Sequence, residues 1–364
     1  MLLNNCKAFY KVASEHITEA SDLPEVVAVG AGRMGRGIAH VMAYAGFHIA
    51  LVDMKTRGLD ERRALMQTAE QEIRTNLATV AHAGIAGQTD VATILSRITY
   101  AIDDEHAAKS LARAGLVFEG VPEVMEQKQA ALERICAGAS EHAIIASTTS
   151  TFSADALAAF VSRAERFLNA HWLNPAYLIP IVEVSPTEQT AETHTAQLID
   201  WLRRAGKLPV RCKPTPGFIV PRIQALAMNE AARLVEDGVA TPGDIDMATR
   251  YGFGVRFAIL GLLEFIDYGG GDILYYASRY LSGALGDDRH AAPEIINDMM
   301  ARGDTGLRAG KGFYDYDNRD VDAYQRETLR KFMDLLAHLE LMPRPHGALA
   351  QSAQQPNTQE PSNN

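Results

Sequence analysis

Residues 26–53 read VVAVGAGRMGRGIAHVMAYAGFHIALVD, and they carry the strongest fold signal in the chain. The apolar run VVAV is typical of a short buried strand, and IAHVMAYAG after the glycines has helical spacing. HIALVD then predicts a second strand that ends at Asp53. Strand, helix and strand within about thirty residues indicate one βαβ unit of a parallel sheet.

The glycines between the strand and the helix follow the spacing G-x-G-x-x-G. Gly30 permits a tight turn, Gly32 lets the backbone approach a pyrophosphate, and Gly35 lets helix and strand pack closely. Arg33 and Met34 lie at the start of the helix, where free N–H groups face the phosphates. The turn therefore predicts a Rossmann-type dinucleotide site.

Asp53 ends the second strand, 23 residues after Gly30. At this distance a carboxylate accepts hydrogen bonds from a ribose 2′-hydroxyl, and it would repel a 2′-phosphate. This favours NAD over NADP as the cofactor. Lys55 and Arg57 lie close by in the sequence and weaken that preference.

Further strands and helices alternate as far as residue 211, which predicts a mostly parallel sheet with helices on both faces. We expect strands at 116–119, 143–147, 167–171, 181–184 and 208–211, and helices near 60–83, 125–138 and 188–205. Ligands bind such sheets at the carboxyl ends of the strands. Glu119, Glu123 and Ser150 follow strands at that edge, where they either face a ligand or belong to a solvated loop.

The pattern changes after KPTPGF (213–218), where helical spacing dominates. The predicted fold class is thus α/β, a Rossmann-type doubly wound sheet followed by a smaller all-α domain. We expect an N-terminal extension at 1–23, an NAD-binding domain at 24–213, a helical domain at 214–340 and a disordered tail at 341–364. Apolar helices in a small second domain favour a homodimer through that domain.

Composition excludes several classes of partner. The chain has 364 residues and a net charge of −10, which argues against nucleic-acid binding. We find no apolar run that approaches the roughly 18 residues of a membrane span, and residues 1–23 do not resemble a signal peptide. Three widely spaced cysteines suggest no zinc site, so we predict no metal and a cytoplasmic location.

Several motifs together resemble the L-3-hydroxyacyl-CoA dehydrogenase family. They are GAGRMGRGIA, VFEGVPE (117–123), ASTTS (146–150), HWLNP…IVEV (171–184), PGFIVPRI and GKGFYDY (310–316). The resemblance covers residues 26–316 and implies oxidation of a secondary alcohol to a ketone, with hydride passing to NAD. It implies that His171 is the catalytic histidine, Glu183 its paired carboxylate and Ser150 the active-site serine.

The same resemblance implies contacts beyond the glycine turn. Cofactor contacts are expected from Glu123, Lys128 and Ser147, and substrate contacts from Asn174 and Arg256.

The chemistry of these side chains agrees with the implied reaction. An alcohol must lose its proton as hydride leaves, and a neutral imidazole is a suitable base near neutral pH. A carboxylate on its other nitrogen, such as Glu183, would fix the tautomer and stabilise the imidazolium. The alternative is that His171 and Glu183 each bond a backbone group or face water.

Four departures from the family pattern concern the substrate. Pro221 replaces an asparagine, and HWLNP lacks the second aromatic residue of the family's histidine motif. NPAYLIP carries Pro180 before IVE. Arg256 in YGFGVRFAILG is suited to bind a carboxylate, and otherwise forms a surface or dimer salt bridge. The hairpin expected near 60–97, where CoA phosphate would bind, has arginines offset by acids and no lysine.

Three functions follow from these observations. The first is an NAD-dependent 3-hydroxyacyl-CoA dehydrogenase, for instance of 3-hydroxybutyryl-CoA. The second is a dehydrogenase of a free small 3-hydroxy acid, similar to the carnitine dehydrogenase and lambda-crystallin branch. The third is a non-catalytic NAD-binding protein.

Overall fold

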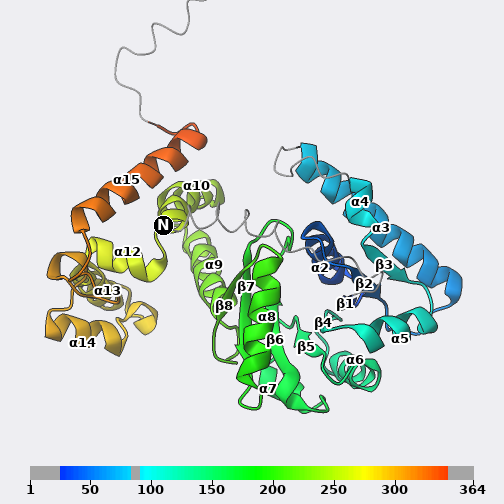
Figure 1. Cartoon of the computed structure of the whole chain (residues 1–364). Coiled ribbons are helices and arrows are strands. Elements are labelled where there is room, and N and C mark those ends of the chain that lie inside the picture. The colour runs from blue at the N-terminus through cyan, green and yellow to red at the C-terminus, as the bar shows by residue number, and fades with distance from the viewer. Residues whose placement is uncertain (1–24, 83–90, 343–364) are drawn as a thin grey trace, which may run out of the picture. The chain divides into compact units, whose positions relative to one another are not determined.

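The computed structural model describes residues 25–82 and 91–342, and the chain divides into two compact units, Met1–Asn229 and Glu230–Asn364. The division falls inside helix α9 (Val220–Glu236), beyond the change in sequence character near residue 213. The expected extension at 1–23 and residues 343–364 of the tail expected at 341–364 lie outside the described residues. Figure 1 shows the elements along the chain.

The first unit contains an eight-stranded sheet in the order β3-β2-β1-β4-β5-β6-β7-β8. Neighbouring strands are parallel except β6 and β7, which are antiparallel, and this confirms the predicted doubly wound sheet. The strands are β1 (Val26–Val29), β2 (Ile49–Val52), β3 (Ile98–Ala101), β4 (Leu116–Glu119), β5 (Ile144–Ser147), β6 (Phe167–Trp172), β7 (Ile181–Pro186) and β8 (Leu208–Arg211).

Alternate strand residues face two separate cores, because side chains of a strand point to opposite faces. Val26 and Ala28 belong to one core, and Val27 and Val29 belong to the other. The first core is covered by α2 (Arg33–Tyr44), α3 (Leu59–His82), α4 (Val91–Leu95) and α8 (Glu192–Arg204). The second is covered by α5 (Asp104–Arg113), α6 (Met125–Gly138) and α7 (Ala154–Ala158).

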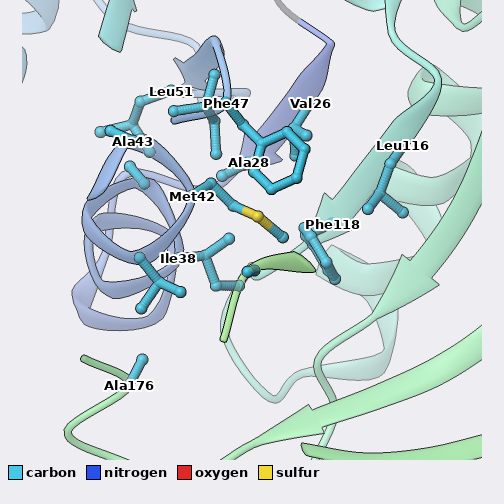
Figure 2. Packing of buried hydrophobic residues seen from close by; sticks show 14 of the residues in the cluster. Val26, Ala28, Ile38, Met42, Ala43, Phe47, Leu51, Leu116, Phe118 and Ala176 are labelled. Atoms are coloured by element: carbon cyan, nitrogen blue, oxygen red, sulfur yellow. The ribbon is translucent and has the colours of Figure 1, made fainter. Parts of the chain in front are cut away.

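Helix α2 packs tightly on the first face of the sheet. Figure 2 shows Ile38 and Met42 of this helix beside Phe118 of β4. All three side chains are fully buried, and burying a side chain of this size stabilises a fold by about 1.5–3 kcal/mol. This packing fixes the N-terminus of α2 at the carboxyl ends of β1 and β4, where the strand order reverses.

The glycine turn has the close contacts that its spacing predicts. Gly30 has φ +102°, and a Cβ there would lie 2.6 Å from the carbonyl oxygen of Gly120. A Cβ on Gly35 would lie 1.9 Å from the carbonyl oxygen of Gly30. Gly32 has nothing within 4 Å of its ideal Cβ position, so its backbone is open to a ligand.

The second unit is helical. Its α-helices are α10 (Pro242–Met247), α11 (Val255–Ile259), α12 (Leu262–Gly269), α13 (Gly271–Leu285), α14 (Glu294–Arg302) and α15 (Val321–His338). The GKGFYDY motif binds back to α12, because Asp267 accepts hydrogen bonds from the N–H groups of Phe313 and Tyr314 and the hydroxyl of Tyr316. This motif therefore stabilises the helical unit.

The edge strand β3 and helices α5 and α7 are absent from the sequence-based expectations. The sequence of β3, ITYA, has two middle residues that are partly or fully exposed, so it lacks the apolar run that identified the other strands. The expected hairpin near 60–97 is observed as α3 and α4, and residues 83–90 between them are outside the described part of the chain.

Candidate active site

A cavity of about 660 Å³ lies where β1, β2, β4 and β5 end. Its lining includes the expected cofactor residues Gly30, Gly32, Arg33, Met34, Asp53 and Glu123. Ser150 and Asn174 line the same cavity, so the structure brings part of the expected substrate site to the cofactor site. Gly35, Lys128 and Ser147 lie behind this lining.

The N-terminus of α2 faces this cavity and fits a dinucleotide pyrophosphate. Gly32 is the N-cap residue, has no side chain to cap the helix, and is followed by a first turn without acidic residues. The first N–H groups of a helix have no intrahelical partners and attract anions. The absence of a Cβ at Gly32 leaves room for the phosphates to reach these groups.

Asp53 follows β2 and is already paired in the structure. Its Oδ2 accepts a hydrogen bond from Nε of Arg57 at 2.7 Å, and Arg57 also contacts Glu61. The carboxylate is 6% exposed and lines the cavity, as expected for a ribose ligand. The sequence suggested that Arg57 lies near Asp53, but only the structure shows the ion pair.

Glu119 is the centre of a buried polar network, and neither of the two sequence-based alternatives describes it. Nζ of Lys128 lies 3.1 and 3.2 Å from its two carboxylate oxygens, and the Ser147 hydroxyl donates to Oε2 at 2.6 Å. The N–H of Val121 also donates to Oε1. Glu119, Lys128 and Ser147 are all 0% exposed. Lys128 and Ser147 thus support the cavity wall from behind.

Glu123 holds the loop that carries Ser150. Its Oε1 accepts hydrogen bonds from the Thr149 hydroxyl, the Ser150 N–H, and both the N–H and the hydroxyl of Thr151. Burial alone would raise the pKa of Glu123, but these hydrogen bonds and the nearby Lys128 ammonium lower it to about 2. The carboxylate therefore stays ionised and fixes the position of Ser150.

His171 and Glu183 face each other across β6 and β7. They are direct partners in the antiparallel register, and Nδ1 of His171 lies 2.7 Å from Oε2 of Glu183. Both side chains are buried, and the ring of Phe218 stacks on the imidazole with centroids 5.6 Å apart. An ionised carboxylate only accepts, so Nδ1 donates and Nε2 carries the free lone pair.

The other oxygen of Glu183 is bound by the start of α9. Oε1 accepts hydrogen bonds from the N–H groups of Ile219 at 2.9 Å and Val220 at 2.8 Å. Burial would raise the pKa of Glu183, but the bonds from His171 and these two N–H groups lower it below its ordinary value. No residue type marks these two donors, because every non-proline residue carries an N–H.

Pro221 is the second residue of α9, which confirms its fit to the first turn of a helix. An N–H at that position would have no intrahelical partner, so proline costs the helix no hydrogen bond there. Glu183 accepts hydrogen bonds from the two preceding N–H groups, those of Ile219 and Val220. The replacement of asparagine by Pro221 therefore keeps the carboxylate anchor and removes an amide side chain.

Ser150 and His171 lie toward the same edge of the sheet. Strands β5 and β6 are parallel neighbours with Ser147 opposite Asn169; Ser150 follows β5, and His171 lies in β6 near its carboxyl end. Arg256 lies in α11 of the second unit, where its guanidinium lies over the ring of Phe265 at 5.6 Å. The structure thus associates Ser150, Asn174 and the cofactor residues, and places Arg256 in the helical unit.

The doubly wound sheet, the open helix N-terminus and the acid after β2 define a dinucleotide-binding protein of the Rossmann class. Models of the NAD-binding and C-terminal domains of 3-hydroxyacyl-CoA dehydrogenase match residues 25–215 and 217–316. The chain belongs to the 3-hydroxyacyl-CoA dehydrogenase family and is an NAD-dependent oxidoreductase. This confirms the resemblance seen in the sequence and the assignment of NAD.

Individual relatives differ in the substrates that their names state. The chain is 31% identical over 316 residues to 5-formyl-3-hydroxy-2-methylpyridine 4-carboxylate 5-dehydrogenase of Mesorhizobium japonicum, covering 86% of this chain and 98% of the relative. It is 33% identical over 299 residues to human mitochondrial hydroxyacyl-coenzyme A dehydrogenase, covering 80% and 90%. The crystal structure of a 3-hydroxyacyl-CoA dehydrogenase from Archaeoglobus fulgidus aligns with a TM-score of 0.69 at 29% identity, covering 87% and 99%.

Two further findings concern the described residues alone. Within 25–82 and 91–342, no three His, Cys, Asp or Glu side chains form a group that could hold a metal ion. In the same ranges, none of the helices combines the length and apolar character that crossing a bilayer requires.

Proposed function

We propose that this protein reversibly oxidises the secondary alcohol of a 3-hydroxy compound to a ketone, with His171 as the base. The observation that supports this most directly is the 2.7 Å contact between Nδ1 of His171 and Oε2 of Glu183. The two backbone N–H groups on Oε1 keep the carboxylate ionised and oriented. This arrangement leaves Nε2 as the nitrogen that receives a proton.

Each side chain then has a defined task. Bound NAD accepts the hydride from the alcohol carbon. Nε2 of His171 takes the hydroxyl proton, and Glu183 stabilises the imidazolium that forms. Ser150, which lines the cavity and is held by Glu123, donates a hydrogen bond to the reacting oxygen. In the reverse direction the imidazolium returns its proton to the ketone oxygen.

The variant His171→Ala tests this assignment. We expect turnover to fall by about 10²- to 10⁴-fold, as for loss of a general base, while NADH affinity measured by fluorescence stays unchanged. His142→Ala is the matched control, because that side chain is 85% exposed and lies outside the cavity lining. A His171→Ala enzyme that keeps most of its turnover would contradict the proposal.

The first candidate substrate is a 3-hydroxyacyl-CoA thioester. Relatives named hydroxyacyl-coenzyme A dehydrogenase and probable 3-hydroxybutyryl-CoA dehydrogenase, the latter from Bacillus subtilis at 29% identity, support this candidate. Because the family's members are NAD-dependent dehydrogenases, we set aside the non-catalytic alternative.

The second candidate is a free 3-hydroxy acid, and the arginines of α3 and of the turn after α4 favour it. Each of them is engaged: Arg62 with Asp104, Arg63 with Asp60, Arg74 with Glu70 and Arg97 with the carbonyl oxygen of Ala43. A CoA phosphate would have to compete with these partners. Pro221 and Arg256 also favour a free acid. Pro221 lacks the amide side chain of the family's asparagine, and the Arg256 guanidinium is suited to bind a carboxylate. The compound named in the Mesorhizobium relative's name is also a carboxylate.

Consumption of NADH with acetoacetyl-CoA or with free 3-keto acids separates the two candidates. Turnover of the thioester alone, unaffected by Arg256→Gln, would support the first and contradict the second. Preference for the free acid, with KM raised in Arg256→Gln, would support the second. Arg279→Gln is the control, since Arg279 lies on α13 of the same unit and its guanidinium contacts Tyr275.

We also propose a cytoplasmic homodimer that forms through the helical unit. Helix α13 presents Ile273, Tyr276 and Tyr280 on one face at helical spacing, and all three are at least 60% exposed. Large exposed apolar patches are typical of interfaces. Sedimentation of the wild type should give a dimer, and Tyr280→Arg should shift it to the monomer. A monomeric wild type would contradict this.

A further inference from the structure

The adenosine end of the cofactor cavity is rich in positive charge. Lys55, Arg57 and Arg134 line the cavity together with Asp53. Lys55 and Arg57 follow β2, and Arg134 reaches the same point from α6 by donating to the carbonyl oxygen of Met54. Three cations therefore surround the carboxylate that is expected to bind the ribose.

The ion pair with Arg57 changes what Asp53 can exclude. A bare carboxylate at this position rejects a ribose 2′-phosphate by charge repulsion. Here Oδ2 of Asp53 accepts from Nε of Arg57 at 2.7 Å, and the Arg57 side chain is only 24% exposed. A partly buried ion pair presents far less negative potential to a ligand than an isolated carboxylate does.

Two of the cations remain available to an anion. In the described residues, the Lys55 ammonium has no side-chain partner, and Arg134 donates through one nitrogen to the backbone carbonyl of Met54. Both side chains are exposed and border the cavity. Arginine binds phosphate oxygens with paired N–H donors, and lysine binds them as a point charge.

We propose that this end of the cavity accepts a 2′-phosphorylated adenosine, so that the protein binds NADP(H) as well as NAD(H). In the NADP(H) complex Arg57 keeps its Nε bond to Asp53 and turns Nη1 from Glu61 to the 2′-phosphate, and Lys55 and Arg134 add charge around it. In the NAD(H) complex Asp53 accepts the ribose hydroxyl. The inference concerns the cofactor alone and holds whichever alcohol the enzyme oxidises.

Binding to the full-length protein tests this without turnover. Titrations with NADH and NADPH, followed by fluorescence, should give dissociation constants within about tenfold of each other. Calorimetry with AMP and with adenosine 2′,5′-bisphosphate isolates the 2′-phosphate from the nicotinamide end. The bisphosphate should bind at least as tightly as AMP, and its affinity should fall more steeply with salt.

Arg57→Gln should weaken NADPH roughly tenfold, the loss of one charge-assisted contact, and leave NADH nearly unchanged. Lys55→Gln should act in the same direction. Arg63→Gln is the control, because Arg63 lies on α3, pairs with Asp60 and is outside the cavity lining. Bound NADH also shows that each variant is folded.

Two results would overturn the inference. One is a wild-type affinity for NADPH more than about 100-fold below that for NADH. The other is an Arg57→Gln variant that loses both cofactors equally. Failure of NADH itself to bind would instead contradict the NAD site, so the two claims fail separately.

Discussion

Glu119 and Glu183 are two carboxylates that are equally buried but have different hydrogen-bond partners. Each lies in a strand of the same sheet, is 0% exposed and accepts at least one backbone N–H. The oxygens of Glu119 are bound by Lys128, Ser147 and Val121, and Lys128 also pairs with Glu123 at 3.4 Å. Glu183 instead pairs with His171, whose second ring nitrogen remains available.

The partner, rather than the burial, separates a structural carboxylate from one that can support proton transfer. A lysine ammonium ordinarily titrates near pH 10.4, whereas an imidazole titrates near neutral pH. An ammonium group offers only N–H donors, whereas the imidazole of His171 has a second nitrogen whose lone pair can receive a proton. Three substitutions test this difference, in order of decreasing effect.

The largest effect is expected from Glu183→Gln. Because Oε1 accepts from Ile219 and Val220, the new amide oxygen will occupy that place and its NH₂ will face Nδ1 of His171. The amide then donates to Nδ1, which forces the proton onto Nε2 and removes the base. Turnover should fall by about 10²- to 10⁴-fold, measured as the initial rate of NADH formation.

The affinity for NADH in Glu183→Gln should equal that of the wild type, because the pair lies outside the cavity lining. Near wild-type turnover would show that Glu183 is structural, like Glu119, and would contradict the functional difference between the two carboxylates.

Lys128→Met addresses the other network and should act on stability. It leaves the buried Glu119 charge without its ammonium, and breaking a buried pair in this way costs about 3–5 kcal/mol. The free energy of unfolding in urea measures this loss. Lys109→Met, which removes an exposed pair with Glu105 on α5, is the control and should change little.

Adding Glu119→Gln to Lys128→Met should recover part of the lost stability, because the unpaired charge is then gone. If Lys128→Met alone is as stable as the wild type, the network contributes nothing to the stability of the fold.

The smallest effect is expected from Glu123→Gln, and it depends on pH. The folded-state pKa of Glu123 is about 2, below its ordinary value of 4.5, so the ionised carboxylate stabilises the fold above pH 4.5. That contribution is lost as pH falls from 4.5 through 2. The stability difference between wild type and Glu123→Gln, measured by urea unfolding at several pH values, should therefore shrink over this window. A stability difference that does not change with pH would contradict this link between the ionisation of Glu123 and folding.

Strong local patterns could be read from the sequence, and weak ones could not. The β1–α2–β2 unit follows from its apolar strands and its glycines, whose tight contacts leave no room for a Cβ at Gly30 or Gly35. The edge strand β3 was missed because its middle residues are partly or fully exposed. The Lys128–Glu119 pair gave no signal either, since a lysine on a helix normally faces water.

The sequence by itself determined the fold class and the NAD site, because these depend on residue type and local spacing. The resemblance of its motifs to the family selected His171, Glu183 and Ser150 as candidates. Only the tertiary structure decided that Ile219 and Val220 orient Glu183, that Arg57 neutralises Asp53, and that Lys128 and Ser147 lie behind the cavity. The physical reason is that backbone donors and ion-pair partners are chosen by proximity in space. Neither residue type nor sequence spacing encodes that proximity.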